Sequence, residues 1–188
     1  MMKFHSASVI FYFLIFPLSG FASTDCGLIV PKDEKIVFAE GEKCVFEIKN
    51  YKNYAGLNYA YIFNDSVKSR IANESTTYMG SGARYFVFDE VDDPRFTQHT
   101  IKNKPILQTK TNGLTAYIGE WVGFVQVASE YKEPNSGYSL NVKCLSAVIG
   151  NERHSLQARF CAPHTRKGDA QVERFKKLIL KTKTSSAE

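Results

Sequence analysis

The chain has 188 residues, 44% of them hydrophobic, with four cysteines and a formal net charge of +5. This length suits one domain with its own hydrophobic core and no need of a structural metal. After the first 22 residues no stretch approaches the roughly 18 apolar residues of a membrane-spanning helix, which excludes a later span of that kind. The basic excess is local, since residues 164–184 hold seven Lys and Arg against two acidic residues.

The first 22 residues have the pattern of a secretory signal peptide. Lys3 is the only formal positive charge before an apolar run over residues 9–16, which is too short to span a bilayer. Pro17 interrupts the run, and Gly20 and Ala22 place small residues at −3 and −1 of a cleavage site. We therefore expect residues 1–22 to be removed and the rest to be exported, to the periplasm if the source is bacterial and otherwise outside the cell.

The mature sequence begins with β-rich segments. Residues 35–39 and 44–48 flank a Gly-Glu pair, which predicts a hairpin. Residues 58–63 predict a third strand with three aromatic side chains on one face, which is either its core face or an exposed interface. Those three residues are Tyr59, Tyr61 and Phe63.

The pattern is less regular up to residue 111. Residues 66–72 predict a short helix, and residues 84–88 predict a strand. Residues 91–111 are polar and contain Pro94 and Pro105, which predicts the longest irregular connection of the chain.

The longest β-rich segments lie in the C-terminal half. Asn112 and Gly113 form a hairpin-type turn, after which residues 114–118 and 121–128 predict two strands. We expect Trp121, at the start of the second of these, to belong to the core and not to a ligand platform.

Two further strands predict the position of a disulfide. If residues 138–149 and 155–161 are joined by a turn at residues 150–153, Cys144 lies opposite Cys161. Opposite residues of antiparallel strands have Cβ atoms about 4.5–5.5 Å apart, close to what a disulfide needs. Four cysteines allow three connectivities, and in an oxidising compartment we favour the two local pairs. These pairs are Cys26–Cys44 and Cys144–Cys161.

The last predicted element is a helix from Asp169, whose carboxylate can cap it, to Thr182. One stripe is apolar and the other side is basic, so the basic side is either a solvated face or a surface for an acidic protein or anionic lipid. Export argues against nucleic acid. The apolar stripe consists of Val172, Phe175, Leu178, Ile179 and Thr182, and the basic side of Arg174, Lys177 and Lys181.

These segments predict an α+β fold. The expected architecture is mainly an antiparallel β-sheet with the C-terminal amphipathic helix packed on it and two disulfides. We expect a single exported domain over residues 23–184, and a disordered C-terminal end over residues 185–188.

The sequence contains no diagnostic catalytic motif. A nucleophilic serine elbow is absent, and the cysteines are expected to be paired and so unavailable as nucleophiles. His164 follows Cys161 with the spacing of half a metal site, but the other ligands are missing. His99 and His154 fall in polar turns, where a solvated imidazole is the default. We therefore expect no catalytic residue, cofactor or metal, and a histidine-dependent hydrolase is the least favoured hypothesis.

An acidic run and a tyrosine cluster supply the candidate partner-binding residues. The acidic run lacks the alternating Asp spacing and glycine turn of a calcium loop, so it either pairs with a basic partner surface or keeps an exposed loop soluble. Tyrosine provides a large, stiff contact area with a polar tip, which interfaces favour. The candidates are Tyr51, Tyr54, Asp89, Glu90, Asp92, Asp93 and His99.

These features favour binding over catalysis. We expect an exported protein-binding domain, an inhibitor or immunity protein that occludes a toxin or cell-envelope hydrolase in the periplasm, with charge complementarity speeding encounter. The alternative is an envelope-associated or host-facing factor that binds anionic surfaces through the basic helix. In that alternative Lys177 and Lys181 would contact an anionic membrane.

Overall fold

The computed structural model describes residues 26–31, 37–40, 44–49, 58–74, 76–79, 82–87, 96–127 and 138–185. Within these ranges, no helix has the length and apolar character needed to cross a membrane. The predicted signal peptide, residues 1–22, lies outside them.

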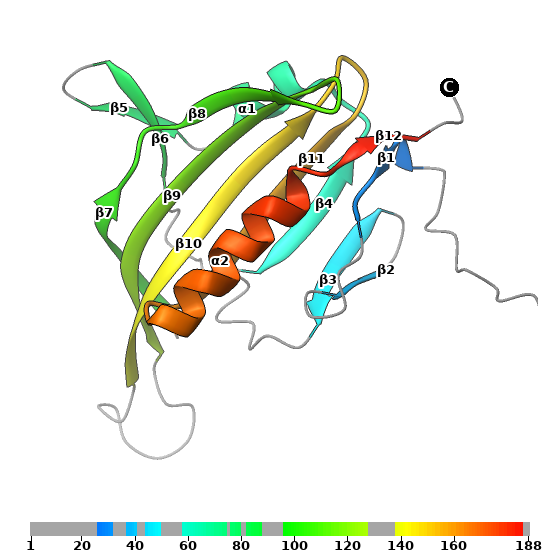
Figure 1. Ribbon diagram of the computed structural model, residues 1–188. Helices are drawn as coiled ribbons and strands as arrows, with labels where there is room; N and C mark the ends of the chain where they lie inside the picture. Colours follow the sequence, from blue (N-terminus) through cyan, green and yellow to red (C-terminus); the bar gives the residue numbers. More distant parts are fainter. Residues whose placement is uncertain are drawn as a thin grey trace, which may run out of the picture.

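Twelve strands and two helices follow one another along the described chain (Figure 1). The N-terminal elements are β1 (Leu28–Ile29), β2 (Val37–Glu40), β3 (Val45–Lys49), β4 (Tyr59–Phe63), α1 (Val67–Asn73), β5 (Thr76–Met79) and β6 (Ala83–Phe86). The C-terminal elements are β7 (Phe96–Asn103), β8 (Leu107–Thr111), β9 (Leu114–Val127), β10 (Tyr138–Gly150), β11 (Ser155–Pro163), α2 (Arg166–Ile179) and β12 (Lys183–Thr184).

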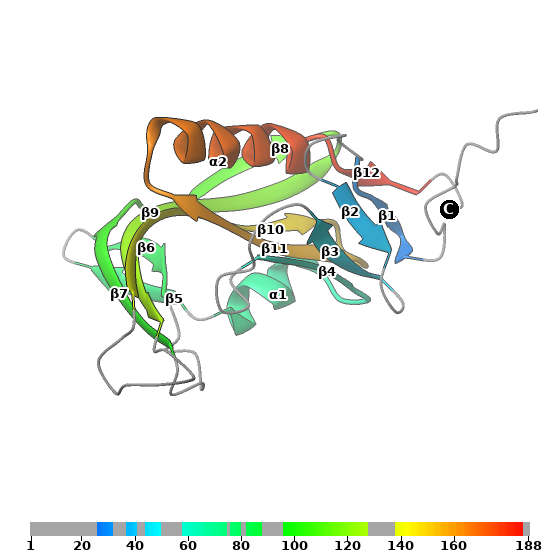
Figure 2. The same ribbon diagram turned by 90° about the horizontal axis from the view of Figure 1, so that it is seen from below.

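Eight of the strands form one antiparallel sheet. Its order is β2-β3-β4-β11-β10-β9-β7, and β8 pairs with the first part of β9. Helix α2 covers one face of this sheet, and α1 lies against the other (Figure 2). Strands β1 and β12 pair with each other, as do β5 and β6. The prediction of a single, mainly antiparallel α+β domain with a C-terminal helix on the sheet is therefore confirmed.

The main hydrophobic core lies between α2 and the sheet. The apolar side chains of α2 recur every three or four residues and so share one face of the helix. That face is buried against the sheet. Phe175 is fully buried and stacks on Phe160 of β11, with the ring centroids 4.9 Å apart. Core residues from the sheet include Leu114, Ile118, Leu145, Ile149 and Leu156.

Both predicted disulfides are present, Cys26–Cys44 and Cys144–Cys161. Cys144 and Cys161 are direct partners in the β10–β11 register, as the turn position implied. Two disulfides indicate an oxidising compartment, extracellular or periplasmic.

The two ends of the described chain lie together. Cys26 lies just before β1 and is bonded to Cys44, just before β3. Strand β1 also pairs with β12, so the N-terminal segment is joined to the segment after α2. Ser185, which the sequence places in the disordered end, is buried, and its N–H donates to the Gly27 carbonyl at 3.1 Å. Residues 186–188 lie outside the described ranges.

The predicted irregular connection over residues 91–111 is wrong for most of its length. Residues 96–103 form β7 and residues 107–111 form β8, both paired with β9. The side chains of β8 are exposed or half-buried, so this strand carries no alternating apolar pattern. Pro105 lies between the two strands, where no ladder hydrogen bond is required of it.

The predicted break between residues 118 and 121 is also wrong. Strand β9 runs unbroken through Gly119 and Glu120, preceded by the expected turn at Asn112 and Gly113, both of which have positive φ. Gly119 is required for a close approach, since a Cβ there would lie 2.5 Å from the Phe86 ring. The glycine therefore marks a packing contact and not the end of a strand.

Helix α2 begins three residues before the predicted cap. Thr165 is the N-cap, and its hydroxyl accepts a hydrogen bond from the Gly168 N–H at 3.1 Å. Asp169 lies within the first turn, where a carboxylate is favourable to the helix dipole. The α1 prediction is confirmed, with Ser66 as its cap.

Candidate functional site

A buried carboxylate marks the most unusual site of the described structure. Leu114, Ala116 and Ile118 of β9 point into the core under α2, and Glu120 is the next residue on that same face. Its exposed fraction is 7%, although alternation predicts an apolar side chain at this position. Buried carboxylates are rare unless they are paired.

Lysines from three different elements surround this carboxylate. Lys104, between β7 and β8, donates to Oε2 at 2.7 Å, and Lys176 of α2 donates to Oε1 at 2.7 Å. Lys143 of β10 lies 4.0 Å from Oε2, and its Nζ also donates to Glu173 Oε1 of α2 at 3.2 Å. Both oxygens of Glu120 are therefore occupied, and the carboxylate connects α2 to β9 and the β7–β8 connection.

The lysines decide the charge state of the carboxyl group. Burial raises the pKa of Glu120, but the hydrogen bonds and charges of Lys104 and Lys176 outweigh it and hold the pKa at about 2. Reciprocally, the hydrogen bond to Glu120 raises the pKa of Lys104. Glu120 is thus ionised at neutral pH, and it fixes the position of two ammonium groups.

A small cavity of about 30 Å³ opens beside Glu120. Its walls are almost wholly apolar, although three of its six lining residues are lysines, so the walls are built from carbon stems with little contribution from the charged ends. The lining residues are Lys102, Lys104, Glu120, Trp121, Val122 and Lys143. We refer to Lys102, Lys104, Lys143 and Lys176, with Glu120 and Glu173, as the lysine cluster.

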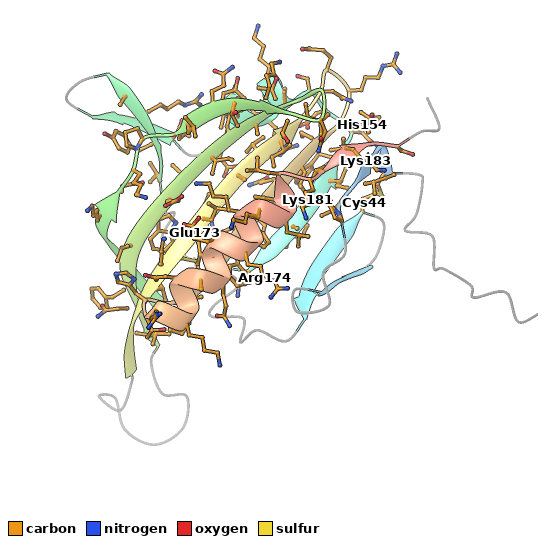
Figure 3. All side chains as sticks on the ribbon, in the orientation of Figure 1. Cys44, His154, Glu173, Arg174, Lys181 and Lys183 are labelled. Atoms are coloured by element: carbon orange, nitrogen blue, oxygen red, sulfur yellow. A yellow bond between two sulfur atoms is a disulfide. The ribbon has the colours of Figure 1, made fainter. Side chains whose placement is uncertain are left out.

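The outer side of α2 adds further positive charge. Its cations are exposed, and Figure 3 labels Arg174 on α2 and Lys181 just after the end of the helix. The exposed basic residues of α2 and the segment after it are Arg166, Lys167, Arg174, Lys177, Lys181 and Lys183. The predicted basic face is therefore present, and the lysine cluster extends positive charge from it towards β7.

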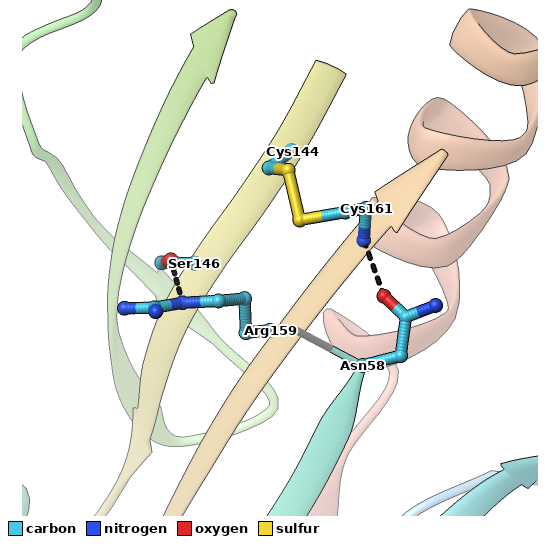
Figure 4. Close-up of a disulfide and its surroundings, with 5 residues drawn as sticks. All are labelled: Asn58, Cys144, Ser146, Arg159 and Cys161. Atoms are coloured by element: carbon cyan, nitrogen blue, oxygen red, sulfur yellow. Dashed lines mark hydrogen bonds between the residues drawn. A yellow bond between two sulfur atoms is a disulfide. The ribbon is translucent and has the colours of Figure 1, made fainter. Parts of the chain in front are cut away.

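The opposite face of the sheet carries the second disulfide (Figure 4). The Cys161 N–H donates to Asn58 Oδ1 at 2.6 Å, and Arg159 Nε donates to Ser146 Oγ at 3.1 Å. Trp121 is 2% exposed and packs in the same cluster as Cys144 and Cys161, which confirms its assignment to the core. The disulfide and these hydrogen bonds connect β10, β11 and the start of β4, and so stabilise the sheet.

The aromatic residues of β4 also lie on this opposite face. Ala60 and Ile62 point to the core, so Tyr59, Tyr61 and Phe63 are half-buried on the other side. The rings of Tyr59 and Tyr61 stack at 5.1 Å, and Arg70 lies 3.6 Å over the Phe63 ring. The three aromatics are therefore neither the main core face of β4 nor freely exposed.

Of the three histidines after residue 22, two have described side chains, His154 and His164, and each contacts a structural neighbour. His164 Nδ1 lies 2.8 Å from Asp169 Oδ1 at the start of α2, while Cys161 is in a disulfide. His154 is half-buried against Gly27, where an added Cβ would lie 2.4 Å from its ring. Within the described ranges, no three His, Cys, Asp or Glu side chains are placed to hold a metal ion.

The predicted partner-binding residues mostly fall outside the described structure. His99 lies in β7, a strand and not the predicted turn, and its side chain is not among those described. Tyr51, Tyr54, Asp89, Glu90, Asp92 and Asp93 lie outside the described residues. Their assignment stays a prediction.

The sequence reasoning missed the lysine cluster. Its members are spread from residue 102 to residue 176, and no spacing connects them. One signal was available, because Glu120 continues the alternation of Leu114, Ala116 and Ile118 once residues 114–127 are treated as one strand. An acidic residue at an inward position requires cationic partners.

Comparison with protein-family models, with curated protein sequences and with solved structures gives no match for this chain.

Proposed function

We propose that the protein is an exported binding domain of the inhibitor or immunity type, which neutralises a toxin or cell-envelope hydrolase by occluding it. The observation that carries this proposal is the lysine cluster, in which ammonium groups from β10, α2 and the β7–β8 connection are held around a buried carboxylate. Cations fixed in this way suit recognition of an acidic protein surface, because little side-chain freedom is lost on binding.

Export is part of the same proposal. The signal-peptide pattern of residues 1–22 and the two disulfides agree on a compartment outside the cytoplasm. The two disulfides brace a domain that must stay folded where no cytoplasmic chaperone is available. A rigid surface also lowers the entropic cost of binding a partner.

The membrane alternative is less well supported by the packing of α2. An interfacial helix inserts its apolar face between lipid head groups. In α2 that face is already covered by the sheet, since Val172, Phe175 and Ile179 are fully buried. Attraction of Lys177 and Lys181 to anionic lipid would then be purely electrostatic and sensitive to salt.

The test combines partner capture with a charge-reversal variant. Tagged mature protein is used to isolate partners from the native envelope or secreted fraction, and the activity of any retained protein is assayed with and without the domain. We expect one stoichiometric partner whose activity is inhibited, and the K177E/K181E variant should retain and inhibit it equally well. Recovery of the domain alone or with anionic lipid, and loss of that lipid in K177E/K181E, would contradict the proposal and favour the membrane alternative.

A further inference from the structure

The cavity beside Glu120 has two properties that seldom occur together. Its walls are apolar, and its volume of about 30 Å³ exceeds the space that one water molecule requires. Yet lysines line it, and Lys104 and Lys143 carry their ammonium groups within 4.0 Å of the same carboxylate oxygen. A group that fills this cavity would therefore need a short carbon stem inside and a negative charge at its end.

The lysine cluster has a net positive charge, which favours an additional negative charge beside it. The lysine cluster holds four lysines and two glutamates, a net charge of +2. Lys104 and Lys176 bond to Glu120, and Lys143 bonds to Glu173. Lys102 lines the cavity and is exposed, and its ammonium group has no hydrogen bond or ion pair to another described residue. Lys104 and Lys102 can still donate to an incoming anion, since each ammonium has three donors.

We propose that this cavity accepts an aspartate or glutamate side chain of a protein partner, with its methylenes between the lysine stems and its carboxylate on Lys102 and Lys104. The inference rests on the proposed function, and it names the chemistry that the partner presents. Inorganic phosphate matches less well, because it is hydrated on all sides and has no apolar part to bury. A lipid phosphate carries its charge between two ester-linked carbon groups and not at the end of a short carbon stem.

The first test measures binding of poly-L-glutamate to the mature protein by calorimetry at low salt. Two variants leave Glu120 and its hydrogen bonds intact. K102Q removes the free ammonium, and V122F fills the cavity without changing the charge. K181Q is the matched control, since it removes one exposed cation from the segment after α2 that does not line the cavity. We expect K102Q and V122F each to weaken binding about tenfold and K181Q less than twofold.

Two results would overturn the inference. One is equal loss in K102Q and K181Q with V122F unchanged, which would mean that binding follows net charge alone. The other is displacement of poly-L-glutamate by inorganic phosphate or phosphatidylglycerol vesicles at equal anion concentration. Thermal unfolding of V122F and K102Q shows whether either variant has a folding defect, so that such a defect is not mistaken for lost binding. In the wild-type protein, the backbone amide of Val122 is followed by NMR as poly-L-glutamate is added, which reports binding at the cavity itself.

Partner capture separates this inference from the proposed function. If wild-type protein retains an inhibited partner and K102Q and V122F lose it, both are supported. If all three retain that partner equally, the inhibitor function stands and the cavity is not its contact. If the wild-type protein inhibits nothing that it retains, the proposed function fails, whatever the peptide measurements show.

Discussion

Two stretches of β9 face the same helix and hold it in different ways. Leu114, Ala116 and Ile118 contribute to an apolar core with α2, whereas Glu120 binds α2 through the Lys176 ammonium. Apolar contact is non-directional and independent of pH. The ion pairs are directional and depend on protonation. The charged stretch therefore fixes the position of α2 on the sheet, whereas the apolar stretch supplies most of the stability.

The apolar stretch should show the largest effect. Phe175→Ala removes a fully buried ring that stacks on Phe160 at 4.9 Å, and should lower the free energy of unfolding by about 3–5 kcal/mol. The exposed Lys177→Ala should change it by less than about 0.5 kcal/mol. Urea unfolding followed by circular dichroism measures both. A loss below about 1 kcal/mol in Phe175→Ala would mean that α2 contributes little to the cooperative core.

Acidification should weaken the charged stretch alone. The folded pKa of Glu120 is about 2, below the ordinary value of 4.5, so its stabilisation is complete above pH 4.5 and is lost as pH falls through 2. The full effect is up to about 3 kcal/mol. We expect the difference in unfolding free energy between wild type and Glu120→Gln to shrink over this interval. A constant difference from pH 6 to pH 2 would contradict the assigned pKa.

At neutral pH the two glutamates of the lysine cluster should differ. Glu120→Gln loses two charged hydrogen bonds in a side chain that is 9% exposed, and should cost about 2 kcal/mol. Glu173→Gln loses one contact to Lys143 from a side chain that is 46% exposed, and should cost less than about 1 kcal/mol. Chemical denaturation of both variants at pH 7 gives the comparison. Equal losses would show that Glu120 has no special role in holding α2.

The same two stretches show what the sequence could predict. The alternation of residues 114–118, the turn at Asn112 and Gly113 and the Cys144–Cys161 pair all followed from local patterns, because strand period and turn chemistry are local properties. The sequence predicts two strands on either side of Gly119 and Glu120, and the Phe86 ring against Gly119 explains the presence of this glycine inside one strand. Polar β7 and β8 carried no alternating apolar signal at all.

The candidate site was less accessible to sequence reasoning than the fold. Glu120, Lys104, Lys143 and Lys176 come together only through the β7–β9–β10 pairing and the return of α2 over the sheet. No spacing in the chain encodes that meeting. The basic character of α2 was visible, but the buried carboxylate that fixes Lys176 and separates it from the solvated lysines was not.

The smallest predicted effect concerns the start of α2. Thr165 accepts the Gly168 N–H, so Thr165→Ala should destabilise the protein by about 1 kcal/mol. Asp169 is inside the first turn and contributes through the helix dipole and its contact with His164, so Asp169→Asn should cost about 0.5 kcal/mol. Thermal unfolding of both variants separates the two assignments. If Asp169→Asn costs more than Thr165→Ala, the capping role belongs to Asp169, as the sequence pattern indicated.

Because Lys176 reaches Glu120 from α2, a helix whose first turn has frayed in Thr165→Ala should leave that ion pair in place, and the acid-dependent part of the stability should be unchanged. A loss of that part as well would mean that the start of α2 and the lysine cluster form one cooperative unit.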